Sequence, residues 1–181
     1  MIELKRDVVA TTIPYGQKTT LPKGSNVEIT QELGGSFTVL TDYGLLRIES
    51  KDSDALGRES AAPLPNAVTA GEVPADAKAV ATLVWDQMKT CYDPEIPVNI
   101  VELGLVYENK VEPIPEGGFK VDVKFTLTAP GCGMGPILQS EVRDKVLGIP
   151  GVKFANIEVV FEPAWTQSMM SDAAKLQLGM M

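Results

Sequence analysis

The sequence predicts an α+β protein whose two parts differ in character. Three short β-like runs separated by glycine-bearing turns fill the first fifty residues. Residues 51–75 carry small and polar side chains, three prolines and no apolar periodicity. Helical and alternating apolar patterns follow one another from residue 76 onward. We therefore expect a small β module at 1–50, a linker at 51–75 and an α+β domain at 76–181.

The first part reads as hairpins. The runs VEITQ (27–31), SFTVLT (36–41) and LLRIE (45–49) are joined by turns that contain Gly34-Gly35 and Asp42-Tyr43-Gly44. Glycine at these points favours tight hairpin turns. About five short strands in fifty residues predict a small β-barrel or a meander. We see no chemical constellation in this part, so we expect a scaffold or a docking module.

The second part begins with a helix. Asp76 suits an N-cap, and an apolar stripe follows at helical spacing. Its members are Val80, Leu83, Val84 and Met88. Cys91 falls at nearly the same angle as Val80, so we expect it to be a small core residue at the end of the helix. A strand is expected at 105–111.

Strict alternation predicts the next strand, 119–128, with one buried and one polar face. Thr126 and Thr128 fall on the polar face. A helix follows with Pro136 in its first turn, where a missing N–H costs nothing. A strand at 157–161 and a helix at 168–178 complete a mixed sheet with about three helices.

Composition limits the partners. The net charge is −8, and no run of Lys or Arg occurs, which argues against nucleic acid and anionic lipid. No apolar stretch approaches the roughly 20 residues of a membrane span, and the start lacks the apolar core of a secretory signal. With only two cysteines we expect a cytoplasmic protein whose thiols are reduced. The absence of histidine excludes Cys-His catalysis within this chain.

One cysteine has an unusual setting. Cys132 lies in TLTAPGCGMGP (126–136), between the predicted strand and the predicted helix. Orphan N–H groups and the dipole at a helix N-terminus lower the pKa of a nearby thiol, which improves it as a nucleophile and as a metal ligand. The three flanking glycines allow a large partner to approach the sulfur. The alternative is a structural cysteine buried in a tight turn.

Other polar residues have two interpretations. The hydroxyl groups of Thr126 and Thr128 suit a site at the strand end, or are ordinary solvent-facing threonines. Asp93 and Glu95 flank Pro94 in a proline-rich loop. Their carboxylates suit a cation or a hydrogen bond from the thiol, and the alternative is a helix-ending turn stabilised by an Asp side chain.

Three segments together resemble a known family. DPEIPVNIVELGLVYE, TLTAPGCGMGP and FEPAW, in this order and spacing, are similar to the iron–sulfur cluster assembly domain shared by SufT-like and PaaD-like proteins. The resemblance covers about residues 76–181, and the added N-terminal segment points to the SufT-like branch. It implies that Cys132 is the key thiol and that Asp93, Glu95 and Thr128 line its pocket. Family members often have a second hydroxyl residue where this chain has Ala129.

The resemblance implies a factor that matures iron–sulfur proteins and is not an enzyme. Its expected partners are the assembly machinery and client apo-proteins. Iron–sulfur clusters normally take four protein thiolates, so one cysteine holds iron or a cluster only transiently. A homodimer would supply a second Cys132. Two alternatives remain open, a thiol-dependent redox enzyme and a pure protein-interaction module.

Overall fold

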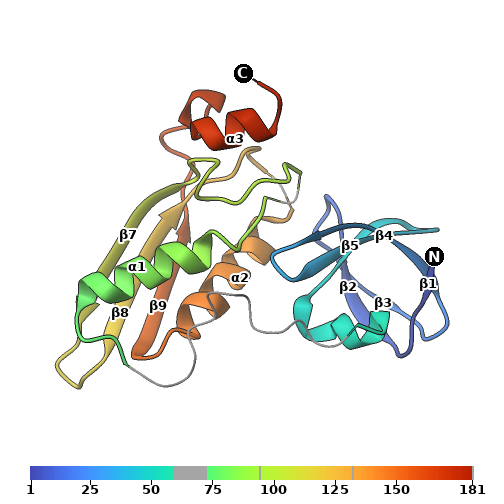
Figure 1. The fold of residues 1–181 in the computed structure, drawn as a ribbon, viewed down its shortest axis with the longest axis horizontal. Coiled ribbons are helices and arrows are strands. Elements are labelled where there is room, and N and C mark those ends of the chain that lie inside the picture. The colour runs from blue at the N-terminus through green and yellow to red at the C-terminus, as the bar shows by residue number, and fades with distance from the viewer. Residues whose placement is uncertain (59–72, 94, 132, 181) are drawn as a thin grey trace. The chain divides into compact units, whose positions relative to one another are not determined.

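The computed structural model describes residues 1–58, 73–93, 95–131 and 133–180. The chain divides into two compact units, Met1–Pro65 and Asn66–Met181. Each unit has its own hydrophobic core among the described residues. Figure 1 shows the strands and helices of both. None of the helices in the described parts of the chain has the length and apolar content that crossing a bilayer requires.

The first unit is a six-stranded sheet in the order β1-β4-β5-β6-β2-β3. Its strands are β1 (Ile2–Glu3), β2 (Val8–Thr12), β3 (Lys18–Leu21), β4 (Asn26–Leu33), β5 (Ser36–Thr41) and β6 (Gly44–Ile48). Strands β4, β5 and β6 form the two predicted hairpins, and together they make a β-meander. Within residues 1–58 no ladder joins β1 to β3. The barrel alternative is therefore not confirmed.

The segment after β6 differs from the expected linker. Ser50–Leu56 form the 3-10 helix η1, and Ala55 and Leu56 are buried in the core of the first unit. Two apolar side chains in a polar stretch are too few to give a periodic signal, which is why the sequence pattern missed this element. Residues 59–72 of the expected linker lie outside the described residues.

The second unit contains a mixed sheet in the order β7-β8-β9. Strand β7 (Val106–Pro113) runs antiparallel to β8 (Phe119–Phe125), and β9 (Val152–Val159) runs parallel to β8. Two helices, α1 (Ala77–Met88) and α2 (Gly135–Leu147), lie side by side against the sheet (Figure 1). Their apolar stripes face the alternating buried residues of β8. Near the C-terminus are the 3-10 helix η2 (Gln167–Met169) and helix α3 (Asp172–Gln177).

Local signals in the sequence correspond to real features. The Asp76 carboxylate accepts a hydrogen bond from Ala79 N at 2.7 Å and caps α1. Pro136 lies in the first turn of α2. Cys91 is fully buried in the core, as expected. Thr126 differs from its prediction: β8 ends at Phe125, so the alternation stops there, and Thr126 is buried with 1% of its surface exposed.

Candidate functional site

The site predicted around Cys132 lies where β8 gives way to α2. Cys132 itself lies outside the described residues. Leu127 and Gly135, on the two flanks of its loop, lie close together. A Cβ on Gly135 would stand only 2.9 Å from Leu127 Cδ1. Helix α2 begins at Gly135, and its N-cap residue Met134 offers no side-chain acceptor to the helix amides.

The strand end is fixed from both sides. Thr126 N donates to Leu105 O at 2.8 Å, and Val160 N donates to Phe125 O at 2.8 Å. The first bond extends the pairing one residue beyond β8, and the second holds the last residue of β8 to the residue that follows β9. The backbone that enters the cysteine loop is therefore anchored by hydrogen bonds as far as Thr126.

Asp93 is a buried charged residue that Thr128, at the start of the cysteine loop, contacts directly. Thr128 Oγ1 donates a hydrogen bond to Asp93 Oδ2 at 3.2 Å. The other carboxylate oxygen, Oδ1, accepts from Glu95 N at 2.9 Å and from Ile96 N at 3.0 Å. Only 5% of the surface of Asp93 is exposed. One side chain thus closes its own loop and ties that loop to the end of β8.

Burial raises the pKa of Asp93, because desolvation penalises the carboxylate. The hydrogen bonds from Glu95 N, Ile96 N and the Thr128 hydroxyl favour the charged form and partly offset this effect. Both oxygens already have protein donors in this geometry. Asp93 is therefore suited to holding the loop in place.

The remaining predicted site residues, Glu95 and Thr126, differ in exposure. Glu95 is exposed, and it approaches Asp93 through its backbone N–H. Thr126 lies two residues before Thr128, but its side chain is buried. Among residues 1–58, 73–93, 95–131 and 133–180, no three Cys, Asp or Glu side chains come together to hold a metal ion. The described residues thus bring Thr128 to Asp93 and do not form a metal centre.

Trp165 has a role that the sequence did not reveal. Its indole Nε1 donates to Leu103 O at 2.7 Å, across 62 residues. Ser171, which was not a candidate, donates its hydroxyl to the carboxylate of Glu102. Local features define the turn itself: the Asn99 side-chain oxygen accepts from Val101 N and Glu102 N, and Gly104 has a left-handed φ of 72°. A glycine break in a short apolar segment does not identify its partner.

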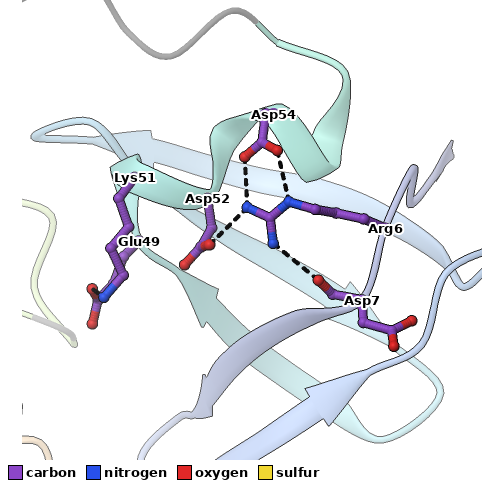
Figure 2. A network of polar contacts seen from close by, with 6 residues as sticks. All are labelled: Arg6, Asp7, Glu49, Lys51, Asp52 and Asp54. Carbon is purple, nitrogen blue, oxygen red and sulfur yellow. Dashed lines mark hydrogen bonds and ion pairs between the residues drawn. The ribbon is translucent and has the colours of Figure 1, made fainter.

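The first unit contains a separate hollow of about 350 Å³. Three basic and three acidic side chains line it: Arg6, Asp7, Lys18, Glu49, Lys51 and Asp52. Figure 2 shows that most of these charges are already paired. Arg6 contacts both Asp54 oxygens at 2.6 Å and Asp52 at 2.8 Å, and Lys51 contacts Glu49 at 2.8 Å. The Arg6 hydrogen bond lowers the pKa of Asp54. These contacts hold η1 against the β1–β2 connection.

Known proteins resemble the second unit. Residues 82–159 match a family described as iron–sulfur cluster assembly protein. A protein of Porphyromonas gingivalis named "Fe-S protein maturation auxiliary factor" is 47% identical over 92 residues, which are 51% of this chain and 84% of that protein. The Staphylococcus aureus protein named "Fe-S protein maturation auxiliary factor SufT" is 42% identical over 87 residues, 48% of this chain and 94% of its own length.

A solved structure agrees with the fold. The crystal structure of a domain of unknown function, DUF59, from Bacillus anthracis aligns with a TM-score of 0.50 and 33% identity. The alignment covers 58% of this chain and 96% of that one. The sequence and structure comparisons thus account for about half of the chain.

Proposed function

Because this chain belongs to the family of iron–sulfur cluster assembly proteins, we propose that it helps to deliver or mature iron–sulfur clusters in client proteins. The observation that supports a site is the contact between Asp93 and Thr128. It fixes the backbone four residues before Cys132, inside the segment that matches the family. We assign the function to residues 76–181, with Cys132 as the thiol that contacts iron, cluster or client.

The proposed cargo is iron or an iron–sulfur cluster held transiently. Clusters normally require four thiolates, and this chain has two cysteines, of which Cys91 is buried in the core. Weak, incomplete ligation suits a factor that must release what it carries. A second copy of the chain or an external thiol would complete the ligand set. We propose a carrier and not an enzyme for the same reason.

We propose that the partners are assembly components and client apo-proteins in the cytosol, where thiols stay reduced. The β module at residues 1–50 would dock one of them. The net charge of −8 disfavours nucleic acid as a partner.

Anaerobic transfer tests the cargo directly. The full chain is incubated with iron, sulfide and reductant, freed of small molecules, and mixed with a [4Fe–4S] apo-enzyme whose activity is followed. We expect the wild type to restore activity and Cys132→Ser to restore little. Equal restoration by Cys132→Ser would reject Cys132 as the carrier residue. No restoration by either protein beyond a buffer control would reject the carrier role.

A further inference from the structure

The turn that follows the Asp93 loop depends on the C-terminal segment of the chain. Leu103 N donates to Asn99 O at 3.0 Å, and Leu105 N donates to Ile100 O at 3.0 Å, which defines one helical turn. Gly104 ends it with a φ of 72°. The last carbonyl groups of such a turn accept no hydrogen bond from N–H groups within it. They therefore need donors from elsewhere in the chain.

Residues 160–180, here called the C-terminal strap, supply those donors. Trp165 Nε1 donates to Leu103 O at 2.7 Å, and Ser171 N donates to Glu102 O at 2.8 Å. The Ser171 hydroxyl also bonds the Glu102 carboxylate. Both terminal carbonyls of the turn are therefore capped by a segment more than sixty residues away in the sequence.

Close packing accompanies these bonds. A Cβ on Gly104 would stand 2.2 Å from Met169 O, so the backbones of turn and strap meet with no room for a side chain. Tyr107 Oη donates to Pro163 O at 2.7 Å, and Gln177 Nε2 donates to Pro97 O at 3.1 Å. The strap thus contacts the chain before, within and after the turn.

The same turn forms the base of the Asp93 loop. Ile100 N donates to Cys91 O at 2.9 Å, and Asp93 N donates to Val98 O at 3.3 Å. Any displacement of the turn therefore moves the loop that aligns the Asp93 carboxylate with its donors at Glu95 and Ile96. A continuous set of hydrogen bonds leads from the strap through the turn to Asp93 and Thr128.

We propose that the side chains of Trp165 and Ser171 are positioning groups for the site: by donating hydrogen bonds to the turn that ends at Gly104, they hold the loop that presents Asp93 to Thr128. This inference rests on the proposed function, because it assigns these residues a part in the maturation of client proteins. They act through the loop and not by contact with iron or cluster.

Hydrogen exchange of the full-length protein tests the coupling. Trp165→Phe keeps an aromatic ring and removes the N–H donor to Leu103 O. Ser171→Ala removes the hydroxyl that donates to the Glu102 carboxylate and accepts from Ala174 N, and it keeps the backbone N–H that caps Glu102 O. We expect the amides of Glu95 and Ile96 to exchange about fivefold faster in either variant, the ratio that one lost hydrogen bond gives. The amide of Val123, in the middle of β8, serves as the internal reference and should be unchanged. Leu176→Ala is the matched control, because this strap side chain is 69% exposed.

Unchanged exchange at Glu95 and Ile96 would overturn the inference. So would an equal rise at Val123, because that result means global destabilisation. Should Trp165→Phe fail to fold, Ser171→Ala decides. A second arm measures client-enzyme activity in cells, with Cys132→Ser as reference. Faster exchange with a loss of client activity supports the positioning role, and faster exchange with full activity refutes it. Full activity of Cys132→Ser would instead show that the proposed function has failed.

Discussion

Asp93 illustrates how a single side chain organises a site. Its carboxylate is buried, carries three hydrogen bonds and joins two loops that are 35 residues apart in the sequence. Water would solvate a free carboxylate better than these donors do, so the protein bears a desolvation cost to keep it there. Such a cost makes the residue sensitive to pH and to loss of its partners.

The raised pKa of Asp93 predicts a specific pH dependence. Below the ordinary aspartate pKa of about 3.9, both folded and unfolded chains are protonated at this residue. Between that pH and the raised pKa, unfolding releases a proton, so the free energy of unfolding falls as the pH rises. Above the raised pKa this contribution is constant. Asp93→Asn should lack this decline, because the amide oxygen still accepts from Glu95 and Ile96 but does not titrate.

Denaturant unfolding of both proteins across this pH range checks the prediction. A wild-type curve that is parallel to that of Asp93→Asn would contradict it, since the two would then share every pH-dependent contribution.

Thr128→Val should remove the hydroxyl donor to Asp93 Oδ2 while conserving side-chain volume. We expect a loss of about 1 kcal/mol in the free energy of unfolding at neutral pH. The pKa of Asp93 should rise further, because this hydrogen bond favours its charged form. Urea unfolding and an NMR titration of the carboxyl group measure the two effects. Thr20→Val, at an exposed strand position, is the control, and an equal loss there would refute a special role for Thr128.

Local signals placed Asp93 and Glu95 in a proline-rich loop and Thr128 near the end of a strand, and the structure joins Thr128 to Asp93 by a hydrogen bond. The part of these residues in a pocket around Cys132 stays a prediction. The orientation of Thr126 was wrong because alternation was extended past Phe125, where the ladder ends. Parity arguments hold only while the strand pairing continues.

Between elements, the contact of the turn at Gly104 with the C-terminal strap leaves no room for a side chain at residue 104. Gly104→Ala should be strongly destabilising for two reasons. A left-handed backbone costs a non-glycine residue about 1–2 kcal/mol. In addition, the new methyl group would meet Met169 O, a backbone atom that cannot rotate away.

Gly117→Ala provides the matched control. Gly117 has a φ of 86°, and a Cβ at this position would have nothing within 4 Å. Urea unfolding should therefore show the backbone cost in both variants and a further loss of about 1–3 kcal/mol in Gly104→Ala alone. Equal losses would mean that the strap moves aside without cost.

Elements were predictable when their signals were short-range. The cap at Asp76, the proline at the start of α2 and the alternation in β8 each depend on a few neighbouring residues. The 3-10 helix η1 and the capping of the 99–104 turn were not predictable, because each depends on a partner remote in the sequence. Propensity and periodicity carry no information about such partners.

At the scale of the whole molecule, two separate cores predict two unfolding transitions. The buried residues of the first unit include Val39, and those of the second include Val123. Each Val→Ala substitution should cost about 2 kcal/mol and lower the Tm of its own unit by several degrees. Calorimetry of the full chain checks this. A single transition that either substitution shifts would contradict this, because the two units would then unfold as one cooperative body.

The family assignment was predictable because three motifs in fixed order lie within one unit. The boundary between the two units, after Pro65, falls within residues 51–75, whose composition differs from the rest of the chain. The sequence did not decide between a barrel and a meander for the first sheet. Strand count alone does not determine whether a sheet closes, since closure depends on pairing between its first and last strands.

In the proposed function, Cys132 is the thiol on which iron–sulfur maturation by this protein depends. The most direct measurement is the activity of iron–sulfur enzymes in cells whose only copy of the chain carries Cys132→Ser, compared with Cys91→Ala, which removes the core thiol. We predict a loss of client activity for Cys132→Ser at normal protein abundance and near-normal activity for Cys91→Ala. Full client activity in the Cys132→Ser cells would rule out this role of Cys132.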